Sequence, residues 1–249
     1  MTILTFLEKF NIKPNNIKIF EEALTHNSYF NEHRAKYLEE FSKFKSNSDF
    51  EKSEFVFNYQ RLEFLGDAVL QIYISDFLYK KYAYKDQGFL TKTRSDLVRE
   101  ESLAYVAKKI GLGKIIRFGT GELNAKGYEK PSILSDIYES FTAAIYLDQN
   151  QNILKNWIES TLIKIGETSE FNELIHDYKS ELQEYIQSGA KRDLKYEVID
   201  THIEEKTKKT VFRVQVKLDN MVFGEGNDFN KQEAERQAAK LALSKLRLE

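Results

Sequence analysis

One short stretch of the chain limits its fold and chemistry more than any other. Residues 60–70 read QRLEFLGDAVL, so that Glu63 and Asp67 lie four positions apart in a mostly apolar run. Positions i and i+4 share one face of a helix. A buried carboxylate is costly unless it is paired, hydrogen-bonded or bound to a metal. The spacing therefore predicts a helix that carries a metal site on its buried or cleft-facing side.

Size and composition allow a real core and exclude several classes of protein. With 249 residues, 41% hydrophobic and 13% aromatic, the chain suits one large domain or two smaller ones. It has no cysteine, which excludes disulfides and thiolate metal ligands. The N-terminus does not resemble a signal peptide, and no run reaches the roughly 18 apolar residues that span a membrane. We therefore expect a cytoplasmic protein without membrane contacts, and we expect no organic cofactor.

The periodicity of the apolar residues divides the chain into two parts. Helical spacing prevails up to about residue 165 and predicts helices at 61–82, 91–110, 132–147 and 151–165. Beyond a short polar linker at 166–175, the pattern predicts a helix at 177–187, strands at 195–200, 210–217 and 220–224, and a helix at 230–247. The core face of that last helix is predicted to consist of Ala234, Ala238, Ala239, Leu241, Ala242 and Leu246. We expect a predominantly α domain at 1–165 and an α+β domain of α-β-β-β-α order at 176–249.

A second pair of carboxylates, Asp136 and Glu139, lies three positions apart in the apolar stretch 132–144. If the two predicted helices pack together, four carboxylates meet, and their repulsion favours a bound cation. An all-oxygen set suits Mg²⁺ or Mn²⁺ and not zinc. Metal ions held by carboxylates and substrate phosphate are common in phosphodiester hydrolysis. From spacing alone, the alternative that these are ordinary solvated helix positions stays open.

Several motifs in order along the chain resemble those of the ribonuclease III family. The most specific is QRLEFLGDA at 60–68, and the others are LTHNSY at 24–29, LTKTRSDLV at 90–98 and KPSILSDIYE at 130–139. The likeness covers nearly the whole chain. It implies a helical endonuclease domain followed by a double-stranded RNA-binding domain. It also implies an endoribonuclease that cuts double-stranded RNA, with precursor ribosomal RNA and structured messenger RNA as substrates.

The resemblance implies a role for each of the four carboxylates. Glu63, Asp136 and Glu139 match the positions that hold Mg²⁺ directly, for which Mn²⁺ can substitute. Asp67 and Glu139 match the catalytic positions. In the implied mechanism a metal-activated water attacks the phosphorus in line, which leaves a 5′ phosphate and a 3′ hydroxyl.

Two positions depart from the family pattern. Gln60 stands where the family usually has Glu, and Gln87 stands where an acidic residue usually precedes the glycine. In the family these positions line one valley, one from each subunit of a dimer. A hydrogen-bonded amide pair and neutral drift are both open explanations.

Phe64 marks an expected interface between two copies of the chain. An isolated phenylalanine in a helix is normally part of the core. By resemblance, however, Phe64 inserts into a pocket of a partner subunit, so we expect a homodimer. Twofold symmetry then creates two acidic sites that face opposite strands of a duplex, which explains paired cuts with short 3′ overhangs.

Residues 177–185 and 230–239 resemble the two helices of a double-stranded RNA-binding domain, which reads A-form shape over about 16 base pairs. The resemblance places Gln183 and Glu184 at the minor groove and Lys231 and Arg236 near phosphates. Lys208 is the best match for the loop histidine that the family inserts into the minor groove. Residues 171–249 hold 14 Lys/Arg against 15 Asp/Glu, so we expect modest affinity with a shallow salt dependence.

A histidine and two other functions offer alternatives to this interpretation. His26 lies near an apolar face, where a lone histidine is more often structural than catalytic. The main rival function is an inactive RNA-binding scaffold on the same fold, which would have lost metal ligands. A phosphatase or DNA nuclease would leave the C-terminal domain unexplained. The charged segment at about 32–58 has no role that the sequence assigns.

Overall fold

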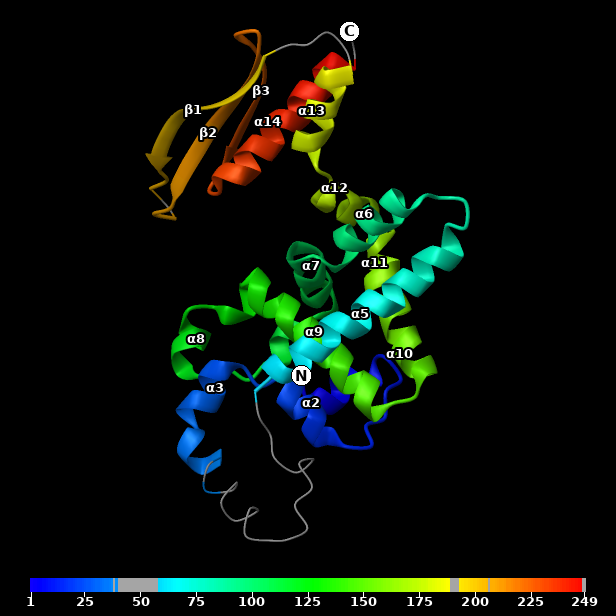
Figure 1. Cartoon of the computed structure of the whole chain (residues 1–249). Coiled ribbons are helices and arrows are strands. Elements are labelled where there is room, and N and C mark those ends of the chain that lie inside the picture. Colours follow the sequence, from blue (N-terminus) through cyan, green and yellow to red (C-terminus); the bar gives the residue numbers. More distant parts are fainter. Residues whose placement is uncertain (38, 40–57, 189–192, 206, 248–249) are drawn as a thin grey trace. The chain divides into compact units, whose positions relative to one another are not determined.

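The computed structural model describes residues 1–37, 39, 58–188, 193–205 and 207–247. They form two compact units, Met1–Ile175 and His176–Glu249 (Figure 1). The first unit is helical and the second has the order α-β-β-β-α, so the predicted fold classes are confirmed. Most of the charged segment at 32–58 lies outside the described residues. No helix in the described part of the chain is long and apolar enough to cross a membrane.

The N-terminal unit is built from helices of very different lengths. In chain order they are α1 (Ile3–Glu8), α2 (Ile17–Ala23), α3 (Asn27–Glu32), α5 (Gln60–Lys81), α6 (Gln87–Val98), α7 (Glu100–Ile110), η2 (Leu112–Ile115), α8 (Thr120–Asn124), η3 (Gly127–Glu129), α9 (Pro131–Asp148), α10 (Gln151–Ile158), the π turn η4 (Glu159–Ile163), α11 (Lys164–Gly166) and α12 (Ser169–Ile175).

Helix α9 is the centre of this unit, and α5, α7 and α2 pack against it (Figure 1). It begins with Pro131, whose fixed φ suits the first turn of a helix, and most of its residues are buried. Gly66 lies in a tight contact between α5 and α9. A Cβ atom at Gly66 would lie 1.9 Å from the carbonyl oxygen of Glu139, so only glycine fits there. This contact sets the spacing of the two helices at the predicted carboxylate site.

Aromatic side chains fill the core on one side of α9. Trp157 stacks on Tyr138 at 5.5 Å between ring centroids, and Phe6 meets Phe141 edge to face at 5.5 Å. The indole nitrogen of Trp157 donates a hydrogen bond to the Thr142 hydroxyl (3.0 Å), so the buried polar group is satisfied. Helix α9 is therefore anchored firmly just beyond its two carboxylates.

The structure corrects three predictions for this unit. The helix predicted at 91–110 is interrupted at Arg99, whose backbone is extended (φ −70°, ψ 159°), and Ser102 restores one hydrogen bond by donating to the Asp96 carbonyl. The helix predicted at 151–165 is interrupted by the π turn η4, after which α11 continues the helical path to Gly166. The expected linker at 166–175 contains α12, which buries Phe171 in the core of the N-terminal unit.

In the C-terminal unit, helices α13 (Tyr178–Ser188) and α14 (Lys231–Leu246) accompany an antiparallel sheet of order β1-β2-β3. The strands are β1 (Leu194–Ile203), β2 (Thr210–Leu218) and β3 (Met221–Asp228). Helix α14 packs on β2 and β3, with α13 beside it (Figure 1). Gly224 and Gly226 let α14 approach, because Cβ atoms there would lie 2.1 and 2.0 Å from helix carbonyl oxygens.

One residue of the predicted core face of α14 is misplaced. Leu241 is 49% exposed, whereas Leu243 is 2% exposed and packs in the core. At 100° per residue the buried positions of α14 centre near Ala242, so that Leu243 falls within the stripe and Leu241 at its edge. The remaining predicted core residues of this helix are buried.

Candidate active site

The contact between α5 and α9 brings the four predicted carboxylates together. Glu63 and Asp67 come from α5, and Asp136 and Glu139 come from α9. Asp67 is exposed, whereas Glu63, Asp136 and Glu139 are partly buried. Because Gly66 lies between the two α5 carboxylates in sequence and against the backbone of Glu139, a tight contact of the two helices lies within the site.

The carboxylates influence one another electrostatically. Burial raises the pKa of Glu139 to about 8, and the nearby charges of Asp67, Asp136 and Glu63 add to the shift. Burial, followed by the charge of Asp136, raises the pKa of Glu63. Burial also raises the pKa of Asp136. These are the shifts expected of like charges that share a poorly solvated site.

Within the described residues no lysine or arginine forms an ion pair with these four carboxylates, although the nearby His26 partly offsets the rise in the pKa of Asp136. Lys130, just before α9, pairs instead with Glu122 at 2.6 Å. The cluster does have hydrogen-bond donors: the Tyr59 hydroxyl donates to Asp136 (3.0 Å) and the Gln71 amide donates to Asp67 (3.4 Å). In the described part of the chain, no three acidic or histidine side chains are gathered closely enough to chelate an ion as they stand. The donor set, all oxygen and uncompensated, fits a hard divalent cation.

Gln60 and Gln87 begin helices and are exposed. Gln60 is the first residue of α5, and Gln87 is the first residue of α6. The Gln87 amide donates a hydrogen bond to the Thr91 hydroxyl within its own helix (3.2 Å). Neither residue belongs to the carboxylate cluster of this chain.

Phe64 is not a core residue. It is 83% exposed, and Ile72 (66%) and Tyr79 (73%) continue an exposed apolar stripe along α5. Beside this stripe lies a hollow of about 410 Å³ lined by Ile72, Tyr79, Leu90 and other residues of α5 and α6. The N-terminal unit therefore presents both a protruding aromatic side chain and an apolar hollow on α5.

His26 has a structural position, as expected from the sequence. It caps α3, accepting a hydrogen bond from the Ser28 backbone at Nδ1 (3.1 Å), and its ring stacks on Tyr59. Burial lowers its pKa.

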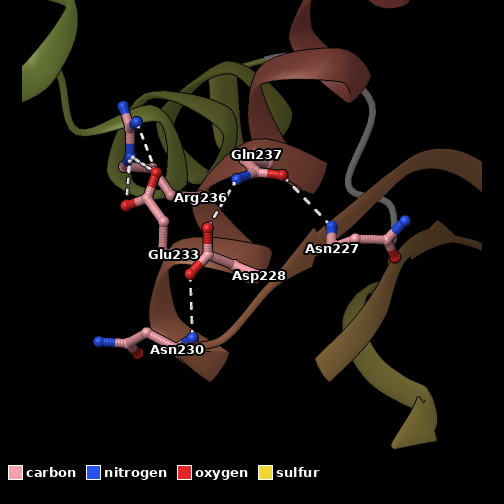
Figure 2. Close-up of polar contacts among 6 residues, drawn as sticks. All are labelled: Asn227, Asp228, Asn230, Glu233, Arg236 and Gln237. Carbon is pink, nitrogen blue, oxygen red and sulfur yellow. Dashed lines mark hydrogen bonds and ion pairs between the residues drawn. The ribbon is translucent and has the colours of Figure 1, made fainter. Parts of the chain in front are cut away.

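The predicted RNA-binding residues of the C-terminal unit fall into two groups. Gln183 and Glu184 on α13, Lys208 in the β1–β2 turn and Lys231 at the start of α14 are all exposed. Arg236 differs, because its guanidinium forms a bidentate pair with Glu233, with contacts of 2.9 and 2.6 Å (Figure 2). Four of the predicted residues are thus accessible, while Arg236 is held by a neighbouring acid.

The first turn of α14 is held in place by a polar network (Figure 2). Asp228 accepts hydrogen bonds from the Asn230 backbone (3.0 Å) and from the Gln237 amide (3.2 Å). Asn230 caps the helix by accepting from the Gln232 backbone (2.9 Å). This network fixes the orientation in which Lys231 is presented.

Comparison with known proteins identifies both units. Residues 16–165 match a family model described as Ribonuclease-III-like, and residues 178–246 match the Double-stranded RNA binding motif. The chain is 52% identical over 247 residues to Ribonuclease 3 of Mesoplasma florum, covering 99% of this chain and 98% of that protein. The chain belongs to the ribonuclease III family. It is therefore an endoribonuclease of the class specific for double-stranded RNA, and the expectation from the sequence motifs is confirmed.

Other relatives agree with this membership in the ribonuclease III family. Ribonuclease 3 of Spiroplasma citri is 36% identical, covering 97% of this chain and 89% of that protein. A crystal structure of the ribonuclease III nuclease domain from Campylobacter jejuni is 32% identical, with a TM-score of 0.53 over 67% of this chain and 97% of that one.

Sequence patterns did not reveal Tyr59 as part of the site. It lies directly before the motif helix, and periodicity cannot show where the hydroxyl of such a residue points. The same limit applies to Glu233, because its i, i+3 spacing from Arg236 signals a pair only once the helix is established.

Proposed function

We propose that Glu63, Asp67, Asp136 and Glu139 form the catalytic centre for cleavage of double-stranded RNA. The observation that carries this proposal is the uncompensated cluster at the Gly66 contact, with the pKa of Glu139 raised to about 8. Four neighbouring acids without a basic ion-pair partner destabilise the fold, and groups with shifted pKa values of this kind cluster at functional sites.

Glu63, Asp136 and Glu139 would hold Mg²⁺, or Mn²⁺ in its place. When bound, such a cation supplies charge stabilisation for the phosphate and lowers the pKa of water. Glu139 and Asp136 would act on the reacting phosphate indirectly, by holding that cation. Asp67 is exposed and hydrogen-bonded to Gln71, which suits it to orient a water molecule and accept a proton at its free oxygen. Addition of water with rupture of the P–O3′ bond gives a 5′ phosphate and a 3′ hydroxyl.

The working form in this proposal is a homodimer. Phe64 is 83% exposed, and the same helix lines an apolar hollow of about 410 Å³ that can receive an aromatic side chain from a second copy. One relative's structure concerns a region involved in dimer formation of its nuclease domain, at 33% identity and a TM-score of 0.51. Two sites related by twofold symmetry produce staggered cuts with short 3′ overhangs. A protein that sediments as a monomer at micromolar concentration would contradict the dimer.

The C-terminal unit is proposed to hold the duplex. Gln183 and Glu184 face the minor groove, and Lys208 and Lys231 lie near the backbone. Arg236 contributes less than these, because Glu233 already occupies its guanidinium. Precursor ribosomal RNA and structured messenger RNA are the proposed substrates, and this places the enzyme in the cytoplasm.

The decisive experiment compares duplex RNA, duplex DNA and single-stranded RNA, each incubated with and without Mg²⁺. We expect cleavage of duplex RNA alone, and only with the metal. Binding of duplex RNA without cleavage in any metal would support the inactive-scaffold alternative. Cleavage of DNA would show that the C-terminal unit does not define the substrate. End analysis of the products then distinguishes a 5′ phosphate from a 3′ phosphate.

A further inference from the structure

Tyr59, the residue directly before α5, contacts the second helix of the carboxylate site. Its hydroxyl donates a hydrogen bond to Oδ2 of Asp136 at 3.0 Å, and the residue is only 5% exposed. We propose that Tyr59 is a positioning residue that fixes the Asp136 carboxylate for metal binding, with the His26 ring as its brace. The inference rests on the proposed role of the carboxylates and adds to it a residue outside the acidic set.

The backbone of Tyr59 forms hydrogen bonds with α5, the other helix of the carboxylate site. Its carbonyl oxygen accepts hydrogen bonds from the backbone N–H groups of Leu62 and Glu63, both at 2.9 Å, so it starts the hydrogen-bond ladder of α5. Its own N–H donates to the carbonyl oxygen of Thr25 (3.1 Å). One residue therefore connects the backbone of Glu63 on α5 with the side chain of Asp136 on α9. A shift of Tyr59 would change the spacing between two of the proposed metal ligands.

His26 limits the movement of the Tyr59 ring. The two rings stack with centroids 5.6 Å apart and planes inclined by 19°. His26 is held in turn, because its backbone N–H donates to the Arg117 carbonyl (3.0 Å) and its ring lies 5.3 Å from that of Phe118. This arrangement gives His26 a role in the site without any contact between its imidazole and the substrate.

The hydrogen bond from the Tyr59 hydroxyl can prepare the Asp136 carboxylate for metal binding. A tyrosine hydroxyl can donate one hydrogen bond, so it occupies one lone pair of Oδ2 and leaves Oδ1 available for a cation. It also restricts rotation of the carboxylate, which reduces the entropy lost when a metal binds. Partners of this kind, which touch a ligand and not the metal, typically change metal affinity or activity by about 10- to 100-fold when they are removed.

The test is Tyr59→Phe, which retains the ring and its stacking and removes only the hydroxyl. Binding of Mn²⁺ and of Mg²⁺ is measured without RNA, by calorimetry and by the metal-induced rise in melting temperature of the full-length protein. We expect the apparent affinity to fall by about 10- to 100-fold. Duplex RNA cleavage should fall at low Mg²⁺ and recover as Mg²⁺ is raised, because the defect lies in metal binding.

Tyr138→Phe is the matched control. The Tyr138 hydroxyl lies on α9 as well and is hydrogen-bonded to the Thr161 hydroxyl at 2.7 Å, but it is completely buried in the core. This control should lower the melting temperature without changing the metal affinity. If Tyr138→Phe weakens metal binding as much as Tyr59→Phe does, general loosening of α9 explains both effects and the proposal is overturned.

A double variant shows whether Tyr59 works through Asp136. In an Asp136→Asn background, Tyr59→Phe should weaken metal binding by less than about twofold, since the group it positions is already altered. An equal loss in both backgrounds would overturn the proposal, as would unchanged metal affinity in Tyr59→Phe alone while the parent binds metal. Absence of metal binding by the parent protein is a different result, because it would overturn the proposed catalytic site itself.

Discussion

Two charged regions of this protein are built on opposite principles. At the contact of α5 and α9, four carboxylates share a partly buried site, and no basic side chain among the described residues pairs with them. At the first turns of α14, positive and negative charges are matched: Arg236 pairs with Glu233, and Lys179 pairs with Glu235 at 2.5 Å. The unpaired negative charges of the carboxylates favour binding of a cation. The paired charges on α14 produce only a weak positive potential that could attract an RNA backbone. The first region is suited to chemistry and the second to modest binding.

Glu139→Gln has the largest expected effect, because it removes one negative charge and one proposed metal ligand from the carboxylate site. We expect cleavage of duplex RNA in Mg²⁺ to fall by about a thousandfold or more, since loss of a group that stabilises a transition state has effects of this order. Duplex binding should stay within about twofold, because α13 and α14 are unchanged. Rate and binding are measured on the same preparation by single-turnover cleavage and by titration in Ca²⁺.

Glu8→Gln provides the control for loss of a carboxylate elsewhere in the N-terminal unit. Glu8 is exposed at the end of α1 and takes no part in the cluster. The Glu8→Gln protein should cleave duplex RNA at the parental rate. Cleavage by Glu139→Gln at more than about a tenth of the parental rate would remove Glu139 from the catalytic set.

The sequence predicted each half of the carboxylate site but not the contact that joins them. The spacing of Glu63 with Asp67, and of Asp136 with Glu139, placed each pair on one helical face. That the faces meet depends on Gly66 lying against a backbone carbonyl, which is a property of two segments far apart in the chain. The family motifs predicted that the two pairs belong to one site, because they contain both segments.

The errors of prediction come from contacts that periodicity does not contain. The break at Arg99 is accompanied by a local hydrogen bond from Ser102 to the Asp96 carbonyl, and α12 is accompanied by burial of Phe171 in the core. The pairing of Arg236 is a local contact, but a count of charges treats it as a free cation. Sequence patterns thus predicted the elements and the acidic residues that come together, and missed the contacts that decide how strongly each residue acts.

Gly66→Ala should disturb the site without changing its charges. A Cβ atom would overlap the Glu139 carbonyl oxygen at 1.9 Å, so α5 and α9 must separate. Overpacking of this kind costs about 3 kcal/mol at its upper end, which corresponds to a fall of about 10 °C in melting temperature for a unit of this size. Separation of the helices should also reduce metal affinity. Calorimetric melting and metal titration measure the two effects.

Gly121→Ala is the comparison for this substitution. Gly121 is also helical, in α8, but nothing lies within 4 Å of the position its Cβ would take. Alanine is favoured over glycine in a helix by roughly 0.5–1 kcal/mol, so melting should be unchanged or slightly higher. Equal destabilisation by the two variants would show that the close approach at Gly66 is not the cause.

The carboxylate cluster should make the metal-free protein less stable as the pH rises. The pKa of Glu139 is about 8 in the folded protein and 4.5 without the fold, so the folded state binds more protons between these values. Stability from this group is complete below pH 4.5 and is lost as the pH rises through 8. We expect the melting temperature in EDTA to fall by about 5 °C between pH 5.5 and pH 8.

Other groups also titrate between pH 5.5 and pH 8. The contribution of Glu139 is therefore measured as the difference in melting temperature between the parent and Glu139→Gln. Burial lowers the pKa of His26, which gives a slope of opposite sign at the acidic end. The variant should show a flatter profile, and Mg²⁺ should stabilise the parent more at pH 8 than at pH 6, since protons compete with the metal for the carboxylates. Parallel profiles for the two proteins would contradict the coupling of Glu139 to the cluster.

The variant with the smallest expected effect tests the paired charges on α14. Glu233→Gln removes the carboxylate that holds the Arg236 guanidinium in a bidentate pair, so that the guanidinium can turn toward an RNA phosphate. We expect duplex RNA to bind about threefold more tightly, with the slope of log affinity against log salt steeper by roughly one unit. Binding is measured between 50 and 200 mM salt, a range chosen because phosphate contacts lose affinity steeply there.

Glu225→Gln makes the same change of charge on the sheet. Glu225 on β3 pairs with Arg213 on β2 at 2.8 Å, so this variant also removes the acidic partner of an arginine, but of one that lies on the sheet and not on α14. If the position of the released arginine matters, Glu225→Gln should leave the salt slope unchanged. Equal steepening by both variants would mean that net charge alone governs binding. If neither variant steepens the slope, Arg236 does not reach the duplex even when Glu233 no longer pairs with it. The contrast between the two charged regions would then lie in geometry and not in charge pairing.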